Sequence, residues 1–264
     1  MRVLVTGANG LLATHVIKLL AESDIPVVGM IRNRKKFLLP LTDGIELRVG
    51  DIGNPNDVEE CMRGCTHVIH AAAFTSQREV VFDAYQKVNV KGTENLLLAA
   101  AKANIRRFVF VSTANTLGYG THESPGSELM PMLPPFTRSF YGRSKQMAEK
   151  LVNNYRDRLD IVTVHPSFMI GPFDAAPSSG QIFSAVVGRR VVFYPPGGKN
   201  FVHVADVATG VKNALLFGER GEKYLLGNKN LSYRQFFKKV LMITGQRAWL
   251  VPIPPFVLVG FGVV

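Results

Sequence analysis

A tyrosine and a lysine stand four positions apart at the start of a predicted helix, in the segment Tyr141-Gly142-Arg143-Ser144-Lys145. At this spacing both side chains project from the same helix face. A free phenol has a pKa of about 10, which is too high for efficient proton exchange at neutral pH, and a nearby cation lowers it. The pair therefore predicts an acid/base site in which Tyr141 exchanges a proton with a substrate oxygen and Lys145 lowers the pKa of Tyr141.

A hydroxyl residue, Thr113, follows a predicted strand over residues 107–112. We expect Thr113, in preference to Ser112, to donate a hydrogen bond to the same substrate oxygen. By itself Tyr-x-x-x-Lys is also found in surface helices, so the spacing alone does not decide the matter. The Tyr-x-x-x-Lys motif follows a glycine-rich first turn and a hydroxyl residue at a strand end. These three motifs in this order favour hydride transfer between a nicotinamide and a carbonyl.

The glycine-rich turn lies between the first predicted strand and the first predicted helix and reads Gly-x-x-Gly-x-x-Ala. Small residues at such a turn let the backbone approach a pyrophosphate, which the exposed N–H groups of the helix then bind. An ordinary strand-to-helix turn has a similar composition. The residues expected at the cofactor are Gly7, Asn9, Gly10, Leu11 and Leu12.

The second predicted strand is followed by Arg32, where an NAD site usually carries an acidic residue. An arginine at this position favours the 2′-phosphate of NADP, so NADP is predicted over NAD, with a solvated basic loop as the alternative. Asp51 and Ile52 follow the third strand and are expected at the adenine, although Asp51 could equally cap a helix that begins near Asn56.

The fourth predicted strand ends in His70-Ala71-Ala72-Ala73. Side chains as small as those of Ala71, Ala72 and Ala73 would let a dinucleotide lie across the strand end. A tightly packed strand terminus is the alternative, and we expect His70 to be packed in the core.

The elements that must position these residues alternate in the pattern of βαβ units. Strands are predicted over 2–6, 26–31, 45–49, 67–71, 107–112 and 161–165, and helices over 11–21, 56–62, 90–103 and 142–155. The predicted fold is α/β, a Rossmann-type doubly wound parallel sheet with a small C-terminal substrate-binding portion. We expect a cofactor-binding core over 1–165 and a mixed α/β portion over 166–264, with substrate contacts from the long loops 115–140 and 171–200.

Composition narrows the function classes. The chain has 264 residues, 47% of them hydrophobic, enough for one large domain, and a net charge of +11 that suits an anionic partner. Its basic residues are scattered and accompany no nucleic-acid motif, so no nucleic-acid partner is expected. Cys61 and Cys65 lack the second Cys/His pair of a zinc site, so no metal is predicted.

The sequences at the two ends of the chain bear on where in the cell the protein is expected. No signal peptide precedes the first strand, which favours the cytoplasm, and the apolar stretch from Phe256 to Val264 is too short for an integral membrane segment, which needs roughly 20 residues. We expect residues 255–264 to begin a helix that a longer gene product would continue.

These motifs together resemble those of the extended short-chain dehydrogenase/reductase superfamily, from Met1 to about Ile253. The matching segments are Val5-Thr6-Gly7-Ala8-Asn9-Gly10, His70 to Ala73, Asn89-Val90-Lys91-Gly92-Thr93, Ser112-Thr113-Ala114, Tyr141 with Lys145, and His165-Pro166-Ser167. The resemblance implies that Asn89 supports the active-site helix and a proton relay, and that Thr113, Tyr141 and Lys145 are catalytic, with Lys145 also binding the ribose. Pro166 and Met169 would line the nicotinamide pocket.

Within the superfamily, Arg32 and the segment Phe201–Ala208 resemble the dihydroflavonol reductase and 3β-hydroxysteroid dehydrogenase branch. The resemblance to this branch implies a small-molecule substrate that is bulky and apolar and carries a ketone or an alcohol group. Nucleotide-sugar dehydratases carry Asp-Glu after the catalytic threonine, where this chain has Ala114-Asn115, which argues against dehydration. Helices 90–103 and 142–155 resemble those that pair in superfamily homodimers.

Two other functions stay open at this point. A nucleotide-sugar epimerase would use the same Tyr/Lys pair with tightly held NAD, and five cations could bind its phosphates, namely Arg138, Arg143, Arg189, Arg190 and Lys199. A sensor that binds NADP without turnover is the other possibility, although such relatives commonly lose the Tyr/Lys pair.

Overall fold

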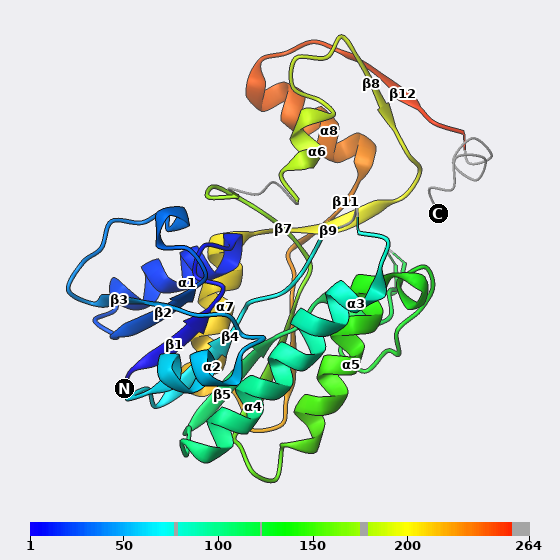
Figure 1. Cartoon of the computed structure of the whole chain (residues 1–264). Helices are drawn as coiled ribbons and strands as arrows, with labels where there is room; N and C mark the ends of the chain where they lie inside the picture. The colour runs from blue at the N-terminus through cyan, green and yellow to red at the C-terminus, as the bar shows by residue number, and fades with distance from the viewer. Residues whose placement is uncertain (77–78, 122, 175–178, 255–264) are drawn as a thin grey trace.

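The computed structural model describes residues 1–76, 79–121, 123–174 and 179–254. Its centre is a seven-stranded sheet in the order β10-β6-β5-β4-β1-β2-β3, and every neighbouring pair is parallel (Figure 1). The strands are β1 (Val3–Thr6), β2 (Val27–Ile31), β3 (Ile45–Val49), β4 (His67–His70), β5 (Arg107–Val111), β6 (Ile161–Pro166) and β10 (Lys223–Leu226). β1, β2 and β6 are buried along their whole length, as expected for strands covered on both faces.

Helices cover both faces of this sheet. On one face α1 (Leu11–Ala21) packs against α7 (Val204–Phe217), and a core that includes Val5, Ile17 and Val211 fills the space beneath them. On the other face α2 (Pro55–Met62), α4 (Gly92–Lys102) and α5 (Phe140–Asn154) cover a second core around Leu96, Phe108 and Phe110. The predicted α/β, doubly wound Rossmann-type architecture is confirmed.

The chain after β6 builds a smaller layer beside the carboxyl ends of the central strands (Figure 1). It has a three-stranded sheet of β7 (Phe168–Ile170), β9 (Gly198–His203) and β11 (Lys229–Ser232), a parallel pair of β8 (Val191–Tyr194) and β12 (Trp249–Pro252), and the helices α6 (Gln181–Ser184) and α8 (Tyr233–Thr244). A third core around Phe201, Phe236 and Val240 holds this layer together. Strand β10 returns to the edge of the central sheet, so the chain after residue 166 contributes to both layers.

The helix predicted over 90–103 is longer than its apolar pattern indicates. A short helix α3 (Phe82–Tyr85) continues into a π-helical segment η2 (Gln86–Lys91), which leads directly into α4. Isolated π turns have no clear sequence signature and are frequent at functional sites. The helix expected over residues 255–264 lies outside the described residues. Among those that are described, no helix combines the length and apolarity that crossing a bilayer requires.

Candidate active site

A cleft of about 2090 Å³ lies at the carboxyl ends of the central strands, between the sheet and the smaller layer. Its walls include fifteen residues that the sequence predicts: Gly7, Asn9, Gly10, Leu11, Leu12, Arg32, Asp51, Ile52, Ala71, Ala72, Ala73, Thr113, Tyr141, Pro166 and Met169. The other two predicted residues, Asn89 and Lys145, are buried behind the wall. Parallel α/β sheets bind ligands at this edge, where the strand order reverses.

The turn after β1 has the form that close approach of a dinucleotide requires. Gly7 has φ +71°, a conformation that favours glycine, and a Cβ there would lie 2.9 Å from the Cα of Ala72. Gly10 precedes α1 with extended backbone and provides no side chain to cap the helix, and the first residues of α1, Leu11 to Ala13, line the cleft. Backbone amides at a helix N-terminus bind anions, and this turn therefore fits a pyrophosphate.

Arg32 follows β2 and lines the cleft beside Asp51 and Ile52. Arg34, Lys35 and Lys36, the basic residues that follow it, form the short helix η1 (Arg34–Lys36) outside the cleft wall. Asp51 does not cap α2, because the cap is Asn54, which accepts from the N–H of Asn56 at 3.0 Å. Asp51 instead accepts from the N–H of Gly53 at 2.8 Å, in a local turn.

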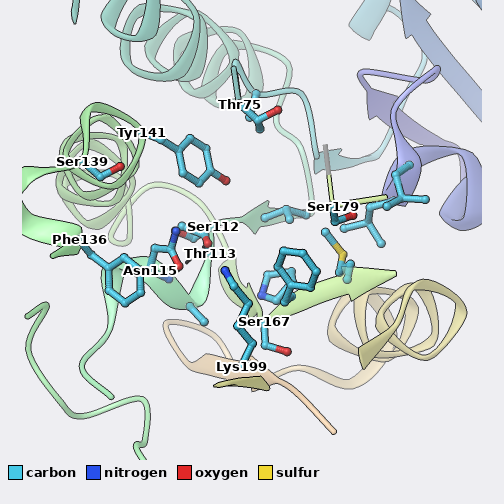
Figure 2. Close-up of a pocket in the computed structure, with 18 of the residues that line it drawn as sticks. Thr75, Ser112, Thr113, Asn115, Phe136, Ser139, Tyr141, Ser167, Ser179 and Lys199 are labelled. Atoms are coloured by element: carbon cyan, nitrogen blue, oxygen red, sulfur yellow. Dashed lines mark hydrogen bonds between the residues drawn. The ribbon is translucent and has the colours of Figure 1, made fainter. Parts of the chain in front are cut away.

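Tyr141 and Thr113 meet at the other end of the cleft. Ser139 caps α5 by accepting from the N–H of Gly142, which places Tyr141 in the first turn of the helix. Figure 2 shows the Tyr141 ring and the Lys199 side chain pointing into one space from opposite sides, with Thr113 between them. Burial raises the pKa of Tyr141 to about 12, although its hydrogen bond with Thr113 acts in the opposite direction.

The direction of this pKa shift differs from the sequence prediction. The Lys145 ammonium donates to the carbonyl oxygen of Val111 at 2.8 Å and lies 4.2 Å from the centroid of the Phe110 ring. Burial lowers the pKa of Lys145 to about 7. The expected lowering of the Tyr141 pKa by Lys145 is therefore not seen in this structure: burial of the phenol raises that pKa, and the group that acts against burial is Thr113.

Asn89, in the π turn η2, connects the active-site helix to the end of β4. Its side-chain oxygen accepts from the N–H of Phe74 at 2.7 Å, and its amide group donates to the Phe74 carbonyl at 3.0 Å and to the Ser144 hydroxyl at 2.9 Å. Ser144 in turn donates to the carbonyl oxygen of Tyr141 at 2.8 Å. Asn89 is thus joined through Ser144 to the turn of α5 that carries Tyr141.

His70 is packed in the core, as expected, and it also takes part in a buried hydrogen-bond chain. Its two ring nitrogens lie 2.9 Å from the hydroxyl oxygens of Thr6 and Thr93. Thr6 accepts from the N–H of Ala72 at 3.0 Å, and Thr93 donates to the Asn89 carbonyl at 2.6 Å. The glycine turn and the π turn are therefore joined through β4.

The substrate side of the cleft includes residues for which sequence reasoning gave no role. They are Thr75, Ser76, Asn115, Ser139, Ser167, Phe168 and Asn200. Asn115 belongs to a short helix (Ala114–Thr116) and Asn200 to β9, and the others lie in loops or at the ends of helices and strands. The loops 74–86, 115–140 and 171–200 are the features of the sequence that signal this region, because loops at the carboxyl edge of a sheet carry binding residues. Of the five cations considered for phosphate binding, Arg138 and Lys199 line the cleft, whereas Arg143, Arg189 and Arg190 do not.

Comparison with known proteins agrees with this fold and site. Residues 3–227 match the model of the NAD dependent epimerase/dehydratase family. A Synechocystis protein named for dihydroflavonol 4-reductase is 32% identical, with 91% of this chain and 72% of that protein covered. A quinoline-oxide ketoreductase of Stigmatella aurantiaca is 31% identical, with coverage of 96% and 76%.

Solved structures share the same fold. The crystal structure of gox2253 superposes with a TM-score of 0.83 at 29% identity, covering 99% of this chain and 84% of that one. The UDP-glucose 4-epimerase of Thermus thermophilus, solved with NAD, has a TM-score of 0.81 at 24% identity, with coverage of 100% and 94%.

The fold and the site thus define a short-chain dehydrogenase/reductase of the extended type. The chain belongs to the NAD-dependent epimerase/dehydratase family, within its dihydroflavonol-reductase-like branch, and is an NAD(P)-dependent oxidoreductase.

Proposed function

We propose that this protein is an NADP(H)-dependent oxidoreductase that transfers a hydride between nicotinamide and a ketone or secondary alcohol on a small, apolar molecule. The observation that carries this proposal is the hydrogen-bonded pair of Tyr141 and Thr113. Both residues line the same cleft as the glycine turn after β1. A proton donor and a dinucleotide cradle therefore open into one space.

The reduction that we propose uses Tyr141 as the acid. With its pKa raised to about 12, the phenol is protonated at neutral pH. It can give that proton to the substrate oxygen as hydride transfer turns the carbonyl into an alkoxide, because an alkoxide is a stronger base than a phenolate. NADPH, when bound, supplies the hydride to the carbonyl carbon. Thr113 donates a hydrogen bond to the same oxygen, and Lys145 binds the ribose hydroxyls and stabilises negative charge on Tyr141 after the proton has left.

Arg32 supports the choice of NADP over NAD. It lies on the cleft wall after β2, beside the adenine-side residues Asp51 and Ile52, where a guanidinium can form charge-assisted hydrogen bonds with a 2′-phosphate. The apolar substrate is supported by Phe136, Phe168 and Met169, which line the same cleft as Tyr141.

The test is reduction of a panel of apolar ketones by purified protein with NADPH, followed by loss of NADPH absorbance. Tyr141→Phe should lower kcat at least about 100-fold while NADPH affinity stays unchanged. Tyr155→Phe, at the far end of α5, is the matched control and should leave the rate unchanged. Tight NADPH binding without turnover of any ketone or sugar nucleotide would instead indicate a cofactor-binding sensor.

A nucleotide-sugar epimerase is the second candidate, and Lys199 is the observation that favours it. Its ammonium lies 4.6 Å from the centroid of the Phe168 ring and faces the cleft, with Arg138 also on the wall. Two cations in the substrate region suit a diphosphate. An epimerase retains its cofactor through turnover, so purified protein that carries NAD and does not exchange it with added NADPH would favour this candidate.

We also propose that the protein is a homodimer formed by α4 and α5. These helices pack side by side on one face of the sheet, and Leu98 on α4 is 51% exposed there. Apolar exposure of this kind is suited to a helix-pairing interface. Light scattering should give twice the mass of the chain, and a monomer at all concentrations would refute the proposal.

A further inference from the structure

A third ionisable residue continues the face of α5 that carries Tyr141 and Lys145. Glu149 lies four residues beyond Lys145, so the three side chains follow one another along one side of the helix. Glu149 is 8% exposed and Lys145 is 1% exposed. An acidic residue is rarely buried to this degree unless it is paired.

The Glu149 carboxylate is surrounded by donors from four other elements. Its Oε1 accepts from the hydroxyls of Ser112 and Thr116, both at 2.5 Å, and from Nε2 of His165 at 3.1 Å. Its Oε2 lies 3.6 Å from the Lys223 ammonium. These partners stand at the end of β5, in the short helix η3 (Ala114–Thr116), on β6 and on β10.

The donors keep this carboxylate ionised. Burial alone would raise the pKa of Glu149, but the hydrogen bonds and charge of His165, together with the bonds from Ser112 and Thr116, lower it to about 2. Two of the partners, Ser112 and Thr116, flank Thr113 in the sequence. A carboxylate bound to both therefore holds the backbone on each side of the hydroxyl that faces the cleft.

The groups around Lys145 do not balance its positive charge, so a nearby anion affects the pKa of Lys145. From β5 it meets the Val111 carbonyl and the Phe110 ring, and from β4 the fully buried His70, whose pKa is lowered by burial and by Lys145. None of these groups is an anion, and burial lowers the Lys145 pKa to about 7, whereas the charge of Glu149 raises it.

We propose that Glu149 is a positioning residue of this active site, whose buried negative charge on the same face of α5 favours the charged form of Lys145 and whose hydrogen bonds fix the segment that carries Thr113. An apolar residue could fill the same space without the cost of burying a charge. Here the buried charge lies on the face of α5 that also carries Tyr141 and Lys145. This inference rests on the proposed function, in which the charge of Lys145 stabilises negative charge on Tyr141 and its amine binds the ribose.

The first test measures the Lys145 ammonium in the wild type and in Glu149→Gln, by NMR of labelled lysine assigned with Lys145→Met. The variant should lower the Lys145 pKa by about one unit or more, a tenfold change in the proton equilibrium. NADPH affinity should then begin to weaken at a correspondingly lower pH. Thr116→Val removes a hydroxyl that contacts Glu149 and the Thr113 carbonyl but removes no charge, and Lys223→Gln removes the cation beside Oε2. Neither variant should lower the Lys145 pKa.

An unchanged Lys145 pKa in Glu149→Gln, or an equal lowering in Thr116→Val, would overturn the proposal. If Glu149→Gln does not fold, the reciprocal measurement is available, because coupling between two sites acts equally in both directions. The Lys145→Met variant should then raise the Glu149 pKa, and no change would overturn the proposal. Failure of the wild type to bind NADPH would refute the proposed function instead, since the lysine and carboxyl titrations do not depend on cofactor.

Discussion

Gly7 and Ala72 approach each other so closely that a methyl group on Gly7 would lie 2.9 Å from the Cα of Ala72. The contact joins the turn after β1 to the end of β4, and the Thr6 hydroxyl that accepts from the N–H of Ala72 reinforces it. The first helical amides reach the cleft only because these two backbones pack without an intervening side chain. Both residues were expected at the cofactor, and their contact explains why both must be small.

Gly7→Ala should weaken cofactor binding. The added Cβ must either push β4 away or move the turn, and the positive φ costs roughly 1–2 kcal/mol in addition. We expect NADPH affinity, measured by fluorescence titration, to fall at least about tenfold. The matched control is Gly188→Ala, because Gly188 also has positive φ, +77°, but a Cβ there meets nothing within 4 Å. Equal NADPH binding by both variants would show that the contact with Ala72 is unimportant.

Arg32→Asp should reduce the preference for NADPH over NADH. A charge-assisted hydrogen bond contributes roughly 1.5–3 kcal/mol, so its replacement by a like charge should weaken NADPH binding by about 10- to 100-fold and leave NADH binding little changed. Arg34→Asp makes the same change of charge outside the cleft wall and serves as the control. If both variants lose NADPH affinity equally, general attraction by the basic loop is responsible.

Six of the seven central strands could be predicted from the sequence because they are short apolar or alternating runs separated by helices of regular period. Strand β10 and the short strands β7, β8, β9, β11 and β12 were not predicted, since each has only three to six residues and no predicted helix separates one from the next. The cofactor turn was predictable because Gly7 is required locally by its backbone. Glu149 was not, because a glutamate in a helix is usually solvated and only the tertiary placement of Ser112, Thr116 and His165 buries it.

Asn89→Ala should weaken both stability and catalysis. The change leaves the backbone groups of Phe74 and the hydroxyl of Ser144 without their partner, and each unsatisfied buried group costs about 1–3 kcal/mol. We expect the free energy of unfolding to fall by about 3 kcal/mol and kcat to fall at least about tenfold, with little change in the KM for NADPH. Asn95→Ala removes one buried hydrogen bond, to the Ile52 carbonyl, and should lower stability without lowering kcat. A parallel loss of kcat in both variants would mean that instability alone explains the effect.

The acid limit of stability should depend on Glu149. Its pKa in the folded protein is about 2, below the ordinary 4.5, so the unfolded chain binds the proton more readily than the folded protein does. The resulting stabilisation is present above pH 4.5 and is lost as pH falls from 4.5 toward 2, and amounts to about 3 kcal/mol. Urea unfolding as a function of pH should show this loss in the wild type and a correspondingly flatter curve in Glu149→Gln. Glu60→Gln removes a carboxylate whose partner is the exposed Arg63, and should leave the pH dependence as in the wild type. If the Glu149→Gln curve follows the wild type below pH 4.5, the hydrogen bonds from Ser112, Thr116 and His165 do not hold this carboxylate ionised.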